Sequence, residues 1–131
     1  MPHGNVDTLS LDNWDAALDI NLRAPFLLAQ ACAPKMTDGG LIVNITDVGA
    51  QKAWSRYPSY TVSKAALESL TRVLARAFAP QIRVNAIAPV MSPTGLIESF
   101  MGMPDTPENR KKFLGNIPLG RLATPTDIAK A

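Results

Sequence analysis

The stretch Tyr60-Thr61-Val62-Ser63-Lys64 lies near the start of the longest helical pattern in the sequence. Pro58 suits the first position of a helix, and Pro80 ends the pattern. Between the two prolines, apolar residues recur at helical spacing, at Val62, Ala66, Leu70, Val73 and Ala77. One long helix is therefore predicted over residues 58–79.

Tyr60 and Lys64 are four residues apart, so both side chains can point into one site on a helix. The ordinary pKa of tyrosine is about 10, and lowering it by about three units takes roughly 4 kcal/mol. A cation at about 4 Å supplies roughly that free energy at an effective dielectric constant near 20. The spacing therefore predicts that Lys64 tunes the acidity of Tyr60. By itself, the pair also fits a half-buried ring beside a solvated charge.

The composition indicates one globular domain. The 131 residues are 47% hydrophobic and 18% charged, with a formal net charge of +2, so a core can form. A net charge this small does not indicate binding to nucleic acid or to an anionic membrane. The basic run Arg110-Lys111-Lys112 fits a solvent-exposed helix face. No apolar run is long enough to span a membrane, no signal peptide is visible, and no metal site is predicted. A cytoplasmic protein is the expectation.

An interrupted helix is predicted before residue 34. Ser10 can cap it, and its apolar residues are Trp14, Leu18, Leu22, Phe26, Ala29 and Ala33. Pro25 interrupts the helix because it has no N–H for the carbonyl of Asn21. Asn21 thus has a free backbone acceptor that can hold a water; the other interpretation is a kinked helix that tolerates an asparagine. The single cysteine, Cys32, fits a buried thiol.

Two short apolar runs, residues 41–45 and 82–88, predict strands on either side of the long helix. Gly39-Gly40 opens a turn before the first run, and Pro89 follows the second. A strand-helix-strand unit of this kind forms a parallel pair, and ligands bind beyond the carboxyl ends of such strands. Asp47 and the segment after Pro89 both follow the carboxyl ends of the predicted strands. We therefore expect them to lie close to Tyr60 and Lys64.

The C-terminal part of the sequence is richer in turns. Residues 90–121 contain several prolines and methionines, with helical fragments near residues 95–103 and 107–116. This pattern fits a mobile lid over a site, or a loosely packed surface segment with no role in a site. Thr124 caps a final helix that begins at Pro125. Two parallel strands form only part of a sheet, so we expect a fragment or a protein that needs a partner.

In order and spacing, these segments resemble the second half of the short-chain dehydrogenase/reductase family through nearly the whole chain. The matching motifs are Asp19-Ile20-Asn21-Leu22, Ile42-Val43-Asn44-Ile45, Tyr60-x-x-x-Lys64, Arg83-Val84-Asn85-Ala86-Ile87-Ala88-Pro89, Pro118-Leu119-Gly120-Arg121 and Thr124-Pro125-x-Asp127-Ile128-Ala129. The resemblance implies an α/β fold with a partial, Rossmann-like, doubly wound parallel sheet. Residues 1–131 would be the C-terminal catalytic half, with 90–121 as the substrate lid. The glycine-rich dinucleotide-binding half would be absent and the isolated chain inactive.

The resemblance also implies site residues. In the family, the tyrosine passes a proton to or from the substrate, the lysine tunes it and binds the nicotinamide ribose, and an asparagine holds a water that extends the relay. Tyr60, Lys64 and Asn21 stand at these positions. The implied contacts to an NADP cofactor, with NAD as the alternative, are Tyr60, Lys64, Pro89, Ser92 and Thr94. Val90 stands where the family usually has glycine.

Asp47 stands where the family usually has serine, thirteen residues before the tyrosine. A serine hydroxyl can donate a hydrogen bond to a substrate carbonyl, whereas an ionised aspartate only accepts. Asp47 therefore suits a substrate with N–H donors, and the substitution resembles the pteridine reductase and dihydromonapterin reductase branch. Its charge should raise the pKa of Tyr60 and keep the phenol protonated for reduction. The alternative is a turn residue in an enzyme that has lost or changed activity.

The expected function is thus an NAD(P)H-dependent oxidoreductase that reduces a pterin-like substrate such as a dihydropterin or dihydrofolate. The alternatives are a carbonyl or 3-oxoacyl reductase of the same family, and a non-catalytic fragment that acts through helix pairing. The resemblance implies a homo-oligomer formed through the helices around residues 10–36 and 58–79. The apolar residues of these helices exceed one face, as buried pairing requires.

Overall fold

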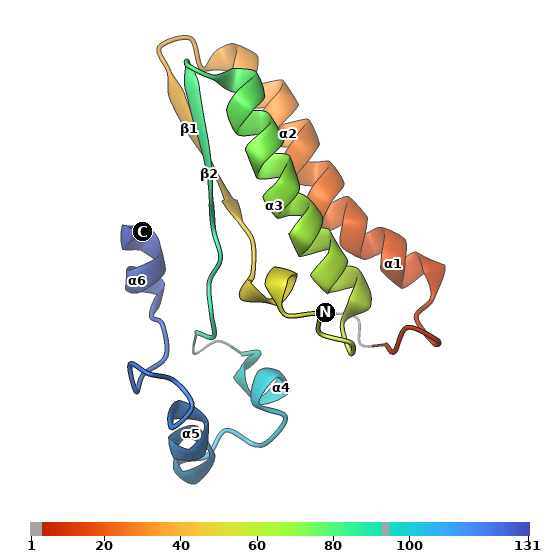
Figure 1. Ribbon diagram of the computed structural model, residues 1–131, viewed down its shortest axis with the longest axis vertical. Coiled ribbons are helices and arrows are strands. Elements are labelled where there is room, and N and C mark those ends of the chain that lie inside the picture. The colour runs from red at the N-terminus through yellow and green to blue at the C-terminus, as the bar shows by residue number, and fades with distance from the viewer. Residues whose placement is uncertain (1–3, 93–94) are drawn as a thin grey trace. The chain divides into compact units, whose positions relative to one another are not determined.

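Two parallel strands and the helices packed on them make up the first unit of the chain, residues 1–88 (Figure 1). The computed structural model describes residues 4–92 and 95–131. Strand β1 spans Gly40–Ile45 and strand β2 spans Ile82–Ile87, with Ile42 opposite Val84. The predicted parallel pair is therefore confirmed.

The glycine turn before β1 is set by close packing. Gly39 has a φ of +90°, which side chains rarely allow. A Cβ added to Gly40 would lie 2.6 Å from the sulfur of Met36. The backbone at position 39 therefore favours glycine, and a side chain at position 40 would have to displace Met36.

The interrupted helix is also confirmed. Helix α1 spans Leu11–Leu18 and helix α2 spans Ala24–Cys32, and the π-helical turn Asp19–Arg23 joins them. Ser10 caps α1, because its hydroxyl accepts the amide of Asn13 at 3.2 Å. The π turn ends just before Pro25, as expected where a proline removes a helical donor.

Helix α3 spans Pro58–Phe78 and lies between the strands and the α1–α2 segment (Figure 1). Its buried residues are Ser59, Ser63, Leu67, Thr71 and Leu74. This is not the apolar row that predicted the helix, since Val62 and Val73 are 44% and 60% exposed. The sequence shows where the apolar residues recur, but not which row the rest of the chain covers.

The apolar core lies where α2, α3 and β2 meet. Ala29, Leu74, Ile82 and Val84 form its buried centre. Cys32 is exposed, so the expectation of a buried thiol is wrong. Ala29 before it and Ala33 after it contact the core, whereas Cys32 does not, so its side chain lies on another face of the helix.

In the second unit, residues 89–131, the described residues form three short helices. They are α4 at Ile97–Met101, α5 at Pro107–Leu114 and α6 at Pro125–Lys130. The two predicted fragments and the final helix are confirmed. Thr124 caps α6 through a reciprocal pair of hydrogen bonds with Asp127, whose carboxylate also pairs with Arg121 at 2.6 Å. Whether this unit acts as a lid stays a prediction.

Candidate active site

The carboxyl end of β1 places Asp47 at the edge of the sheet. The amide of Thr46 donates to the carbonyl of Ile87 at 2.8 Å, which extends the pairing of the two strands. Asp47 follows directly and caps a short 3-10 turn, Val48–Gln51, because its Oδ1 accepts the amide of Gly49 at 2.6 Å. Oδ1 is thus hydrogen-bonded to the loop, and Oδ2 remains available to a second donor.

Tyr60 reaches that second oxygen from the first turn of α3. Its hydroxyl donates to Oδ2 of Asp47 at 2.7 Å. Both residues are half-buried. The structure therefore brings together the two residues that the sequence placed at a strand end and at a helix start.

Lys64 lies one turn further along α3. Its Nζ donates to the carbonyl of Ile45 at 2.8 Å and lies 5.8 Å from the centre of the Tyr60 ring. The first contact ties the helix to the last residue of β1, and the second is within range of a cation–π interaction. Lys64 thus belongs to the same group as Tyr60 and Asp47.

The electrostatics of the group differ from the first expectation. The pKa of Tyr60 is raised above its ordinary value, first by burial, then by the hydrogen bond to Asp47, then by the charge of that carboxylate. The pKa of Lys64 is lowered by burial, and Asp47 opposes this. Lys64 is not among the causes of this shift: its ammonium donates to the Ile45 carbonyl, while the phenol donates to Asp47. That Lys64 tunes Tyr60 stays a prediction. The predicted effect of Asp47 has the right sign.

Asn21 joins the group through a residue that the sequence reading missed. Its side-chain amide donates to the hydroxyl of Ser63 at 3.1 Å, and that hydroxyl donates to the carbonyl of Tyr60 at 2.8 Å. Ser63 is 0% exposed. The available signal was its place three residues after Tyr60, since a helical serine often bonds a carbonyl of the preceding turn.

Replacing Ser63 by alanine is expected to lower the free energy of unfolding by about 1–3 kcal/mol, because the Asn21 amide and the Tyr60 carbonyl would lose their partner. Ser59 is the matched control, since it is also 0% exposed but its hydroxyl has no hydrogen-bond partner within the described residues. Ser59→Ala should leave stability unchanged or raise it. Urea unfolding of both variants makes the comparison; equal losses would contradict the bridging role.

The predicted cofactor contacts outside α3 remain predictions. Pro89 and Ser92 belong to the second unit, and Thr94 lies outside the described residues. Across the part of the chain that the structure describes, no group of three or more His, Cys, Asp or Glu side chains could hold a metal ion. Over the same residues, no helix combines the length and apolarity of a membrane span.

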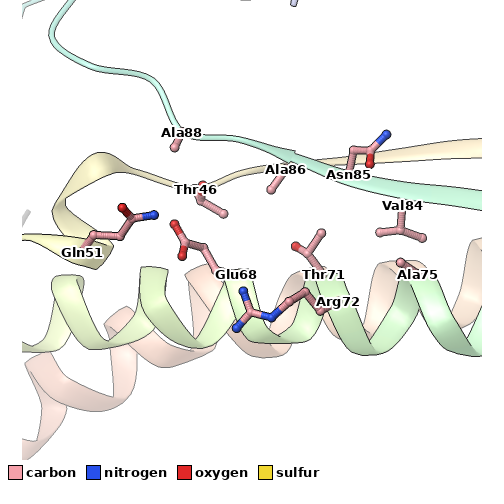
Figure 2. A pocket seen from close by; sticks show the side chains of 10 residues that line it. All are labelled: Thr46, Gln51, Glu68, Thr71, Arg72, Ala75, Val84, Asn85, Ala86 and Ala88. Atoms are coloured by element: carbon pink, nitrogen blue, oxygen red, sulfur yellow. The ribbon is translucent and has the colours of Figure 1, made fainter.

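A groove of about 390 Å³ lies elsewhere in the first unit, between α3 and the carboxyl ends of the strands. Figure 2 shows Glu68 and Arg72 projecting from α3 beneath Thr46 and Ala86. Its lining, as far as the described residues define it, includes none of Asn21, Asp47, Tyr60 and Lys64. The four predicted catalytic residues therefore lie outside this lining: hydrogen bonds link Asn21, through Ser63, and Asp47 to Tyr60, and Lys64 lies over the Tyr60 ring.

Comparison with known proteins identifies relatives along the whole chain. The sequence profile of the family described as enoyl-(acyl carrier protein) reductase matches residues 1–131. The chain is 37% identical over 134 residues to the 4-formylbenzenesulfonate dehydrogenase TsaC1/TsaC2 of Comamonas testosteroni, covering 98% of this chain and 53% of that protein. It spans about half the length of the curated relatives it matches.

Solved structures agree with this assignment. FolM alternative dihydrofolate reductase 1 from Brucella canis, complexed with NADP, matches with a TM-score of 0.79 and 32% identity, over 98% of this chain and 49% of that one. A short-chain dehydrogenase/reductase described as a glucose/ribitol dehydrogenase, from Brucella melitensis, matches with a TM-score of 0.87 and 25% identity, over 99% and 51%. The α/β fold is thus part of a Rossmann-like one. The chain belongs to the short-chain dehydrogenase/reductase family of oxidoreductases.

Proposed function

We propose that this chain supplies the proton-donating half of an NADPH-dependent reductase that acts on a C=N bond of a pterin-like compound. The observation that carries the proposal is the hydrogen bond of 2.7 Å from the Tyr60 hydroxyl to Oδ2 of Asp47. A serine at position 47 would offer a donor, whereas the aspartate offers a charged acceptor. The site therefore favours a substrate that presents N–H groups.

The direction of the reaction follows from the state of Tyr60. Its pKa is raised, so the phenol keeps its proton over the neutral range. Reduction of a C=N bond needs one proton on the nitrogen, and the Tyr60 hydroxyl holds that proton. Asp47 stabilises the protonated phenol and accepts an N–H of the substrate ring when the substrate enters.

The residues of α3 fit the ribose of a nicotinamide cofactor. Lys64 has three N–H donors, and the described contacts use one of them, on the carbonyl of Ile45. The other donors are suited to ribose hydroxyls, with Tyr60 beside them. A bound nicotinamide supplies the hydride for the carbon of the C=N bond. The NADP in the similar FolM structure supports NADP over NAD.

The remaining predicted residues complete this proposal. Asn21 would hold the water that returns protons to Tyr60 by way of Lys64, while Ser63 fixes its side chain. Pro89, Ser92 and Thr94 would contact the cofactor, and residues 90–121 would close over the substrate. In this view residues 1–131 are the catalytic half of a longer protein, and a glycine-rich dinucleotide-binding half completes it.

The test is the substrate specificity of the protein that contains this chain. Asp47→Ser is expected to lower kcat/KM for dihydrobiopterin, dihydrofolate or dihydromonapterin by about 10- to 100-fold, the value of one hydrogen bond to a charged acceptor. Asp38→Ser, at an exposed position, is the control. Oxidation of NADPH is followed with each substrate. Unchanged pterin turnover in Asp47→Ser would remove the substrate assignment.

A carbonyl or 3-oxoacyl reductase is the second candidate. It is favoured by the match to the enoyl-(acyl carrier protein) reductase profile and by the relative named as a formylbenzenesulfonate dehydrogenase. Here Asp47 would be incidental to substrate binding. Turnover of an acetoacetyl thioester, with none of the dihydropterins, would favour this candidate.

Helix pairing is the third candidate, and it carries the proposal of a homo-oligomer. Large apolar side chains are exposed on the helices around residues 10–36 and 58–79: Ile20 is 71% exposed, Leu28 64% and Val73 60%. A contiguous surface of such side chains would be a site for association with a second copy. Fluorescence titration of the isolated chain with NADPH, with molecular size measured in parallel, separates the candidates. Association without cofactor binding would favour a non-catalytic fragment.

A further inference from the structure

The loop between Asp47 and α3 folds back so that Trp54 covers Gly49. A Cβ added to Gly49 would lie 2.7 Å and 2.8 Å from two carbons of the Trp54 ring. No side chain fits there without displacing the ring, and Gly49 is buried. The indole is therefore packed directly on the backbone of Gly49.

That backbone holds the carboxylate of Asp47. The Gly49 amide donates to Oδ1 at 2.6 Å, and the same added Cβ would lie 3.0 Å from Oδ1. The two carboxylate oxygens thus have separate partners, the Gly49 amide on one side and the Tyr60 hydroxyl on the other. Rotation of the carboxylate would move both oxygens away from these partners together, because the two oxygens belong to one planar group.

The indole is itself held in place. Its ring lies edge-on to the ring of Tyr57, with 6.4 Å between the centres. The amide of Tyr57 donates to the carbonyl of Trp54 at 3.0 Å, and Tyr57 directly precedes α3. The ring that covers Gly49 is therefore anchored to the start of the helix that carries Tyr60.

We propose that Trp54 is a positioning residue for the site: by closing over Gly49 it fixes the carboxylate of Asp47 so that Oδ2 faces the Tyr60 hydroxyl. The link runs from the indole to the Gly49 amide, from the amide to Oδ1, and from Oδ2 to the phenol. Its catalytic value rests on the proposed function, but the orientation of Asp47 is a property of the chain without cofactor or substrate. It can be tested without turnover.

The measurement is the pKa of the Tyr60 hydroxyl, followed by NMR on a chain with isotope-labelled tyrosine and assigned with Tyr60→Phe. Among the described residues, Asp47 accepts the hydrogen bond of this hydroxyl, and the Lys64 ammonium lies 5.8 Å from the centre of the same ring. In Trp54→Ala the pKa of Tyr60 should fall toward the value in Asp47→Asn, because the carboxylate turns away. Trp54→Phe should keep the high value, since a ring still covers Gly49.

Trp14→Ala is the matched control, because it removes the chain's other indole from α1. It should leave the pKa of Tyr60 unchanged even where it lowers stability. Should Trp54→Ala fail to fold, Gly49→Ala replaces it: the added methyl group must displace the indole or the carboxylate, and the pKa should fall in the same way.

A tyrosine pKa that stays high in the folded Trp54→Ala or Gly49→Ala chain, with only the unfolding midpoint lowered, overturns the proposal. In that case the indole merely stabilises the loop. These titrations contain no substrate, so a negative result leaves the reductase proposal standing. Conversely, failure of every substrate assay does not alter the titration.

Discussion

Tyr60→Phe is expected to slow reduction by about 10²- to 10⁴-fold in the protein that contains this chain, which is the usual contribution of a positioned proton donor. The substitution removes one oxygen and keeps the ring beside Lys64, so substrate and cofactor should still bind. The loss should appear in kcat rather than in KM. Initial rates of NADPH oxidation over a range of substrate concentrations measure it.

Tyr57→Phe is the control for this loss. Tyr57 lies three residues earlier and packs edge-on against Trp54, so its hydroxyl is outside the bond between Tyr60 and Asp47. Activity should stay within a few-fold of the unchanged protein. A Tyr60→Phe enzyme as fast as the control would show that another group donates the proton.

Asp47→Asn is expected to lower the pKa of Tyr60 markedly. The carboxylate raises this pKa in two ways, by accepting the hydrogen bond of the phenol and by its negative charge, and an asparagine side chain has no such charge. Burial, the largest cause, remains, so the pKa should stay above the ordinary value of about 10. An NMR or absorbance titration of the chain, with Tyr60→Phe for assignment and Asp38→Asn as control, measures the change.

The same shift makes stability depend on pH. Since the pKa of folded Tyr60 lies above the unfolded value of about 10, its contribution to stability is complete below that pH. It is lost as the pH rises through the folded value, because the unfolded chain releases the proton first. In Asp47→Asn the two values lie closer, so less stability should be lost above about pH 10. Identical alkaline unfolding of both chains would mean that the hydrogen bond does not form in solution.

Local sequence rules predicted much of the first unit. Pro58 and Pro80 bracket α3, which spans Pro58–Phe78, and the apolar run at residues 41–45 matches β1. The meeting of Asp47 with Tyr60 was also predictable, because one follows a parallel strand and the other opens the helix that crosses back over it. These inferences need only periodicity, proline chemistry and topology.

The contacts that set the chemistry were not predictable in this way. The buried row of α3 contains Ser59, Ser63 and Thr71, and periodicity alone points instead to its apolar residues. The pKa of the Tyr60 hydroxyl depends on how deeply the hydroxyl is buried and on which polar group it is hydrogen-bonded to. Both are properties of tertiary packing, so the spacing of Tyr60 and Lys64 could not show that the phenol would be buried and hydrogen-bonded to Asp47.

The hydrogen bond from Lys64 to the carbonyl of Ile45 has a consequence for how the site withstands mutation. A peptide oxygen is present whatever residue occupies position 45, so exchange of that isoleucine for another strand-forming residue keeps the acceptor. The hydroxyl of Ser63 likewise ends on the peptide oxygen of Tyr60. Position 45 can therefore change in evolution without loss of the hydrogen bond from Lys64, because the acceptor is a backbone atom whose position depends on the path of the main chain.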